Sequence, residues 1–277
     1  MNFNIYSKQI SFYIRQIYQF CFALFYIITY VIICTEYFCA FLLKGYLFMA
    51  YRYRNICRGI FISRPNRFIA NVEINGEVCV CHVKNTGRCK ELLIKGCTVI
   101  LEESGNPARK TKYDLIAVYK GEKLINIDSQ VPNKCAAEFI PKLFENVTLI
   151  KPEFTYGSSR FDFYIETLSD KIFLEVKGVT LEEKGIVRFP DAPTERGVKH
   201  LKELKRCAAE GYKAYVLFVV QMDGVTLFTP NYDTHKAFGD TLADAVKNGV
   251  TALAYDCLVT EDSIEIKNEI PIKLFQQ

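Results

Sequence analysis

The stretch SRFDFYIETLSDKIFLEVK, residues 159–177, decides the fold of the C-terminal half of the chain. Two runs of aromatic and aliphatic residues flank the polar tetrapeptide Thr167–Asp170, which predicts two antiparallel strands joined by a short loop. With that loop, Asp162 lies directly across from Glu175. Lys177 projects from the same face, because side chains two residues apart share one face of a strand. The hairpin therefore predicts two carboxylates and a lysine on one patch of sheet.

Two facing carboxylates repel each other unless a cation lies between them, and Mg²⁺ or Mn²⁺ accepts oxygen ligands of this kind. Asp162 and Glu175 are therefore candidate metal ligands, and Lys177 is a candidate catalytic residue that orients the attacking water or stabilises developing charge. Glu153 and Glu138 are candidates for a third acid, because each precedes the hairpin. The alternative is that Lys177 forms an ordinary salt bridge on the sheet face with one of the two carboxylates.

The residues around the hairpin predict a mixed sheet with helices on its faces. Asn133 is a candidate cap for a preceding helix that Pro141 would kink or break. After the hairpin, Thr194 is expected to cap a helix over about 195–210. The unbroken apolar run 215–220 predicts a buried central strand, and the rest of the pattern predicts a helix over 241–247 and a strand over 250–257.

The segment from Ile56 to about 127 has the pattern of a small β-barrel. The pattern predicts five strands with a helix between the third and fourth. It rests on runs of alternating apolar and polar residues, the hairpin signal Asn75–Gly76 and a short helical piece, GRCKELL. This order is typical of an OB-fold.

Basic residues gather in the connections of this predicted barrel, where OB-folds bind oligonucleotides. Two candidates lie in SRPNR, the connection between the first and second predicted strands, and two lie in the loop after the third strand. Three lie in the loop GNPARKTK, and two more lie near the start of the helix expected over about 195–210. The candidate nucleic-acid-binding residues are Arg64, Arg67, Lys84, Arg88, Arg109, Lys110, Lys112, Arg196 and Lys199. The alternative is that these side chains only keep the loops and the helix surface soluble.

Charge and cysteine content narrow the classes of protein further. The 277 residues carry 35 Lys and Arg against 31 Asp and Glu, so nucleic-acid affinity has to come from local patches rather than from bulk charge. The 11 cysteines include no CxxC pair, which excludes a zinc ribbon and a thioredoxin-type motif. Single cysteines within apolar runs are typical of reduced, buried thiols, so we expect a cytoplasmic protein.

The first 48 residues differ in composition from the rest. A run of 20 uncharged residues, QIYQFCFALFYIITYVIICT, lies between Arg15 and Glu36 and is long enough to cross a bilayer as a helix. One interpretation is therefore a membrane anchor over about 16–43. The other, which the abrupt change at Met49 favours, is an upstream extension that is not part of the working protein.

Several motifs resemble, in the same order, those of the sugar fermentation stimulation protein A family. They are HVKNTGRCKELL, NPARKTKYDLIAV, NIDSQVPN, SRFDF, LEVKGVT, FPDAPTERGVKHLKEL and GVTALAY, and they span most of 54–272. The resemblance implies an OB-like domain at 49–130 followed by a PD-(D/E)xK nuclease-like domain at 131–277, an α+β or α/β chain in which a mixed sheet is flanked by helices.

The resemblance also places the nuclease-like motif on the residues that the hairpin selects. Its acidic element falls on Asp162, and its ExK element falls on Glu175 and Lys177, while Phe161 stands where the pattern name has proline. Similar proteins begin near Met49, so residues 1–48 have no counterpart.

Three hypotheses about function follow. The first is a metal-dependent nuclease that acts on DNA through the three hairpin residues. The second is a DNA-binding regulator of sugar metabolism that keeps the nuclease fold without turnover. The third is a membrane-tethered protein, which depends on residues 1–48 belonging to the native chain.

Overall fold

The computed structural model describes residues 50–85 and 87–274. The predicted extension over 1–48, with its candidate membrane span at 16–43, lies outside the described residues. Of the helices in the described ranges, none combines the length and the apolar character that a bilayer crossing requires.

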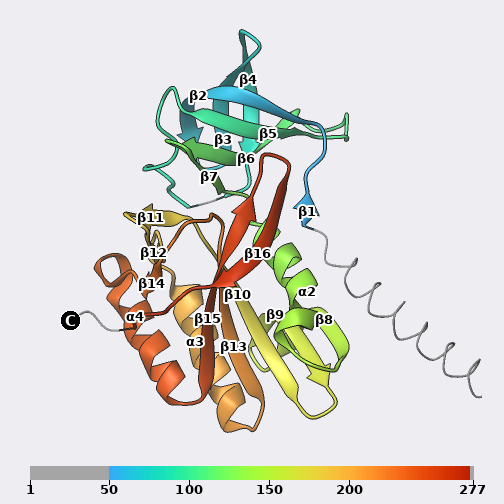
Figure 1. Ribbon diagram of the computed structural model, residues 1–277, viewed down its shortest axis with the longest axis vertical. Coiled ribbons are helices and arrows are strands. Elements are labelled where there is room, and N and C mark those ends of the chain that lie inside the picture. The colour runs from blue at the N-terminus through green and yellow to red at the C-terminus, as the bar shows by residue number, and fades with distance from the viewer. Residues whose placement is uncertain (1–49, 86, 275–277) are drawn as a thin grey trace, which may run out of the picture. The chain divides into compact units, whose positions relative to one another are not determined.

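The N-terminal part is a closed β-barrel, as the alternation predicts (Figure 1). Antiparallel neighbours follow the order β4-β3-β2-β5-β6-β7, and a parallel pairing of β4 with β6 closes five of these strands into the barrel. Ala70, Val72 and Ile74 alternate inward along β3 and are buried. The strands are β2 (Ile56–Asn66), β3 (Ile69–Ile74), β4 (Glu77–Val83), β5 (Thr98–Glu103), β6 (Tyr113–Lys120) and β7 (Lys123–Asn126).

The prediction of a helix at GRCKELL is wrong. Residues 87–93 form a single turn in which the backbone N–H groups of Leu92 and Leu93 both donate to the carbonyl of Cys89, at 3.2 and 2.9 Å. Cys89 has a φ of 45°, a left-handed conformation that a right-handed helix does not accommodate. The apolar side chains that suggested a helix are buried from this turn instead.

The C-terminal part is a mixed seven-stranded sheet with the order β1-β16-β15-β13-β10-β9-β8. Its centre is parallel, β10 with β13 and β13 with β15, and its outer pairings are antiparallel. The strands are β1 (Tyr51–Arg52), β8 (Val147–Tyr156), β9 (Ser159–Thr167), β10 (Lys171–Val179), β13 (Lys213–Val220), β15 (Val250–Val259) and β16 (Ser263–Glu269). A small second sheet contains β11 (Leu181–Glu183), β12 (Ile186–Phe189) and β14 (Leu227–Pro230). Although β1 precedes the barrel in sequence, it extends the C-terminal sheet.

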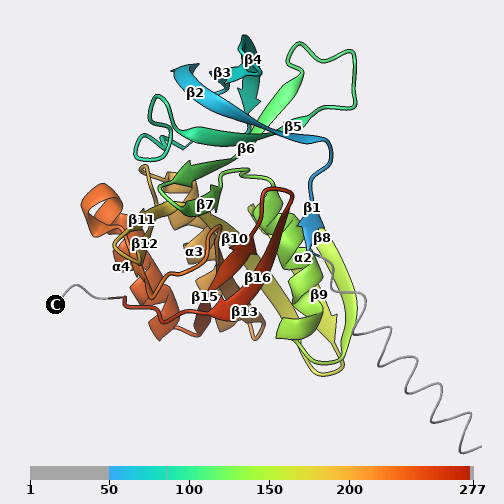
Figure 2. The same cartoon turned by 45° about the horizontal axis from the view of Figure 1, so that its top comes forward.

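Three helices pack against this sheet (Figure 2). Buried side chains of α3 (Glu195–Ala209) and α4 (Tyr232–Lys247) join one hydrophobic cluster, and those of α2 (Val131–Leu143) join another. The predicted cap of α3 is confirmed, because the Thr194 side chain accepts a hydrogen bond from the Gly197 N–H. The prediction for Asn133 is wrong: α2 is already helical there, and Gln130 occupies the N-cap position. Pro141 does not break α2, which continues to Leu143.

The barrel and the sheet share hydrogen bonds where β7 ends. The Asn126 backbone N–H donates to the Gln221 carbonyl at 2.9 Å, and the Gln221 side chain donates to the Asn126 side-chain oxygen at 3.0 Å. Both residues are buried. These bonds anchor the end of the barrel beside the carboxyl end of β13.

Candidate functional site

The candidate site begins where strands β9 and β10 stop pairing. Their ladder runs from Lys171–Glu166 to Leu174–Phe163, the register that the sequence predicts. Beyond it, the backbone N–H of Val176 donates to Oδ2 of Asp162 at 2.8 Å. The Asn133 side chain, from α2, donates to Oδ1 of the same carboxylate at 2.8 Å. Asp162 is thus held from two sides at the end of the hairpin ladder.

Glu175 lies deeper in the structure, with 2% of the residue exposed. Its Oε1 accepts hydrogen bonds from the Lys177 ammonium and from Nδ1 of His200, which α3 carries. Its Oε2 is buried and has no hydrogen-bond partner. A buried carboxylate oxygen left without a partner costs free energy, and a bound cation relieves that cost.

The two carboxylates differ in acidity. Burial raises the pKa of Asp162, and the charge of Glu175 raises it further, against smaller opposing effects from the Val176 N–H and Lys177. Burial also acts to raise the pKa of Glu175, but the hydrogen bond from His200 and the charge of Lys177 outweigh it, so that this pKa is lowered. Glu175 is therefore the more firmly ionised of the pair. A divalent cation between them would favour the ionised form of both.

The donor set fits a magnesium-type ion. Among residues 50–85 and 87–274, no group of three or more His, Cys, Asp and Glu side chains is arranged to hold a metal. The chain thus offers Asp162 and Glu175, with an unpartnered oxygen on the latter. Mg²⁺ commonly binds through one or two carboxylates while water and substrate phosphate complete its coordination.

The two candidates for a third acid lie in other surroundings. Glu153, on β8, is exposed and forms an ion pair with Arg160 at 3.6 Å. Glu138, on α2, is partly buried, and burial together with the charge of Glu265 raises its pKa. Both therefore have electrostatic neighbours other than Asp162 and Glu175.

Sequence reasoning missed two residues of the site, His200 as a partner of Glu175 and Asn133 as a partner of Asp162. His200 is buried on α3, and its Nε2 accepts from the Arg196 guanidinium at 3.4 Å. The available signal was the position of His200 within the inward-facing stripe that contains Val198 and Leu201. Asn133 gave no such signal, because its role depends on where α2 crosses the sheet.

Three of the predicted nucleic-acid-binding residues have partners within the barrel. The Arg64 guanidinium donates to four backbone carbonyls of residues 67, 85, 87 and 88, and so fixes that loop. Lys84 lies 3.3 Å from a carboxylate oxygen of Asp114 and 3.1 Å from one of Asp128. Arg109 also contacts Asp114, with the shorter of two hydrogen bonds at 2.5 Å.

The other six predicted residues are exposed. Lys112 pairs with Glu103 at 3.2 Å, and Lys199 donates to the Ser158 carbonyl at 2.8 Å. Arg196 lies one helical turn before His200, and is the predicted basic residue that the structure connects to the carboxylate site. The remaining three are Arg67, Arg88 and Lys110.

Comparisons with known proteins match both halves of the chain to one family. The model described as "SfsA N-terminal OB domain" matches residues 62–127, and the model described as "Sugar fermentation stimulation protein RE domain" matches residues 130–263. A sugar fermentation stimulation protein homolog of Clostridium beijerinckii is 62% identical over 225 residues, covering 80% of this chain and 100% of that protein. A homolog of Desulfitobacterium hafniense is 60% identical over 226 residues, covering 81% and 99%.

A solved structure is also similar to most of the chain. The structure of Pyrococcus furiosus SfsA in complex with Ca²⁺ matches with a TM-score of 0.75 and 28% sequence identity, and covers 81% of this chain and 99% of that one.

Proposed function

The chain belongs to the sugar fermentation stimulation protein (SfsA) family, and from the geometry at Asp162 and Glu175 we propose that it is a divalent-metal-dependent phosphodiesterase that cleaves nucleic acid. One observation carries the proposal: a buried glutamate with an unpartnered oxygen lies beside an aspartate fixed at the end of a hairpin ladder. The Pyrococcus furiosus relative, solved with Ca²⁺, supports a divalent cation. We take DNA as the substrate, because the resemblance to this family implies DNA binding.

Each residue of the site has a separate role in the proposed reaction. Asp162 and Glu175 would hold Mg²⁺ or Mn²⁺, which supplies an activated water and a positive charge at the phosphodiester. Asn133 orients the Asp162 carboxylate, and His200 holds Oε1 of Glu175, which leaves the unpartnered Oε2 to bind the metal. Lys177 carries its ammonium next to the metal-binding carboxylate, where it can stabilise negative charge that develops on the phosphate.

A second candidate function is a DNA-binding regulator that does not turn over. The direct ion pair between Lys177 and Glu175 favours it, because that pair already neutralises part of the carboxylate charge. On this alternative, the exposed basic residues bind phosphates and the three site residues stabilise the sheet.

The test compares the full chain with Asp162→Asn, using labelled single-stranded and duplex DNA and RNA in Mg²⁺, Mn²⁺ or EDTA. The proposal expects cleavage that requires metal and falls at least a hundredfold in the variant. Asp170→Asn, at the opposite end of the same hairpin, is the matched control and should cleave like the wild type. Salt-sensitive binding with no cleavage in any metal would support the regulator instead.

A further inference from the structure

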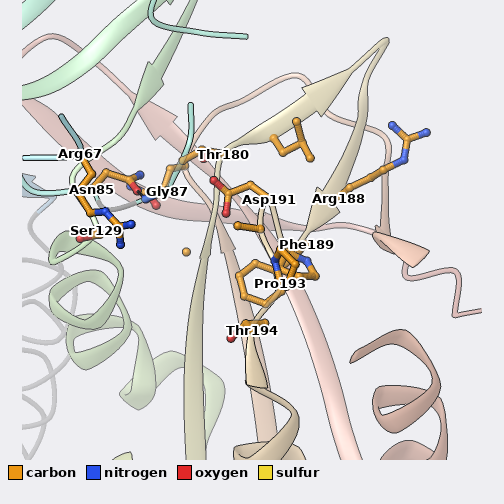
Figure 3. Close-up of a pocket in the computed structure, with 15 residues that line it drawn as sticks. Arg67, Asn85, Gly87, Ser129, Thr180, Arg188, Phe189, Asp191, Pro193 and Thr194 are labelled. Atoms are coloured by element: carbon orange, nitrogen blue, oxygen red, sulfur yellow. Dashed lines mark hydrogen bonds between the residues drawn. The ribbon is translucent and has the colours of Figure 1, made fainter. Parts of the chain in front are cut away.

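Two adjoining pockets lie between the barrel loops and the loop after β12. The first, which we call the Arg67 pocket, has a volume of about 370 Å³ and is lined from the barrel by Arg67, Asn85 and Gly87, and from the sheet domain by residues 188–194 among others (Figure 3). The second, the Arg88 groove, has a volume of about 470 Å³ and is lined by Arg88 and Lys90. Arg67, Gly87 and Ala192 line both, so the two pockets lie next to each other.

The Arg67 pocket and the carboxylate site both include residues of β10. Gly178, which lines the pocket, directly follows Lys177 in that strand. Gln221, at the carboxyl end of the parallel neighbour β13, lines it as well. Thr194 reaches the pocket from the N-cap of α3, the helix that carries His200 to Glu175. Carboxyl ends of parallel strands are the usual place for ligands in sheets of this kind.

The loops that form the pocket touch each other. The Arg88 backbone N–H donates to Oδ2 of Asp191 at 3.0 Å, and a Cβ on Gly87 would lie only 2.4 Å from the same oxygen. Figure 3 shows the Asp191 carboxylate directed toward Asn85 and Gly87, whereas the Arg188 side chain points away from them. A base-paired duplex is far wider than an opening bounded by two loops in contact. A single unpaired nucleotide has the size of the ligands that pockets of a few hundred Å³ accept.

The lining suits both parts of a nucleotide. Phe189 lines the pocket and is half-buried, and its ring packs against Phe218 and Phe238 at centroid distances of 5.8 and 5.1 Å. Aromatic rings bind bases of any sequence by stacking. Arg67 supplies a cation for phosphate, and the hydroxyl of Thr180 supplies a hydrogen-bonding group. The Arg88 groove is lined by Arg88 and Lys90 as well as Arg67, and these cations can contact the phosphates of the neighbouring nucleotides.

We propose that the Arg67 pocket receives one unpaired nucleotide of the substrate and that the adjoining nucleotides follow the Arg88 groove, so that the enzyme acts on single-stranded nucleic acid. This inference rests on the proposed function for its place beside the cleavage site. The pocket itself can be tested without metal or turnover.

The binding test measures fluorescence anisotropy in EDTA with the full chain, using a labelled single-stranded oligodeoxynucleotide and the same strand in a blunt duplex. We expect the single strand to bind at least tenfold more tightly than the duplex. Ala192→Leu places extra volume where the two pockets join and should weaken single-strand binding at least tenfold. Its matched control is Ala237→Leu, an exposed alanine on α4, which should bind like the wild type.

A second variant guards against a folding defect in the first. Arg67→Ala should lose single-strand affinity and lower the salt dependence of binding, whereas Lys171→Ala, an exposed lysine at the start of β10, should change neither. Equal affinity for single strand and duplex would overturn the inference, as would wild-type binding by both Ala192→Leu and Arg67→Ala.

The outcomes also separate this inference from the proposed function. Selective single-strand binding that the pocket variants abolish, without cleavage in any metal, would keep the pocket and refute the nuclease. Metal-dependent cleavage that requires Asp162 but proceeds normally on duplex in Ala192→Leu would keep the nuclease and refute the pocket.

Discussion

The carboxylate of Asp162 accepts the hydrogen bond from the backbone N–H of Val176 that a carbonyl of a paired strand would otherwise accept, with a distance of 2.8 Å between Oδ2 and the amide nitrogen. Two residues earlier on β10, Leu174 still pairs with Phe163 in the strand ladder. The side chain thus ends the ladder and satisfies the amide that the ending exposes. This bond fixes a carboxylate next to Glu175 without a loop having to carry it.

Removal of the second donor to Asp162 should weaken metal binding without removing a ligand. In Asn133→Ala, Oδ1 loses its hydrogen bond from α2, and the carboxylate is held by Val176 alone. Loss of a partner that orients a metal ligand typically costs about 10–100-fold in metal affinity. Calorimetric titration with Mn²⁺ measures the effect, and Asn268→Ala, at an exposed asparagine of β16, is the control. Unchanged Mn²⁺ affinity in Asn133→Ala would show that Val176 suffices to orient Asp162.

Lys177 should matter for cleavage more than for metal binding. Lys177→Met keeps much of the side-chain volume and leaves Glu175 its hydrogen bond from His200. We expect the cleavage rate to fall about a hundredfold or more, the range found when a group that stabilises developing charge is removed. Mn²⁺ affinity should not fall, because the removed group is a cation beside the metal ligands. The comparison variant is Lys171→Met on the same strand.

A purely structural role for Lys177 would give a different pattern. The urea midpoint would then drop in Lys177→Met, while any cleavage per folded molecule would stay at the wild-type rate.

The strands of the hairpin could be predicted from sequence because their register depends only on local alternation and a four-residue loop. Thr167 N–H donates to the Asp170 carbonyl at 2.9 Å, which closes the loop at the expected positions. The contacts that complete the site are not local. His200 is 25 positions from Glu175 and Asn133 is 29 from Asp162, so their meeting depends on how α2 and α3 cross the sheet.

The basic residues of the barrel loops could likewise be predicted only in part. Their concentration in the barrel loops was visible, but alternation does not reveal which of them face a buried carboxylate. Lys84 and Arg109 both converge on Asp114, whose position on β6 read only as part of a strand. The strands β8 and β16 were also missed, because neither shows a regular alternation of buried and exposed residues.

Asp114 should make the barrel acid-sensitive. Burial acts to raise its pKa, but hydrogen bonds and charges from Arg109 and Lys84 outweigh it and lower the pKa to about 2. Between about pH 4 and pH 2 the unfolded chain therefore binds a proton that the folded chain does not. The stabilising contribution is present above the ordinary aspartate pKa and is lost as pH falls through this window.

The Asp114→Asn variant tests this. It should destabilise the protein by about 2 kcal/mol at neutral pH, because Lys84 and Arg109 lose a buried counter-charge. Its urea midpoint should also depend less on pH between 4 and 2 than that of the wild type. Asp240→Asn, at an exposed residue of α4, should leave both the midpoint and the pH dependence unchanged. Parallel pH profiles for Asp114→Asn and the wild type would contradict the assignment.

Gly178 should tolerate no side chain, because β10 passes close to α2 and to the end of β13 at this residue. A Cβ there would lie 2.6 Å from Oε1 of Gln221 and 2.8 Å from Cγ of Pro132. Gln221 is buried and bonded to Asn126, and Pro132 is fixed in the first turn of α2, so neither can move freely. Gly178→Ala should therefore destabilise the protein by about 1–3 kcal/mol, the usual cost of overpacking. Gly105→Ala is the matched control, since nothing lies within 4 Å of its added Cβ.

Because Gly178 follows Lys177 and lines the Arg67 pocket, the Gly178→Ala variant should also bind single-stranded DNA less tightly under conditions where it is still folded. Urea unfolding and anisotropy on the same samples would measure both effects, and a Gly178→Ala protein as stable as Gly105→Ala would mean that Gln221 or Pro132 can move aside.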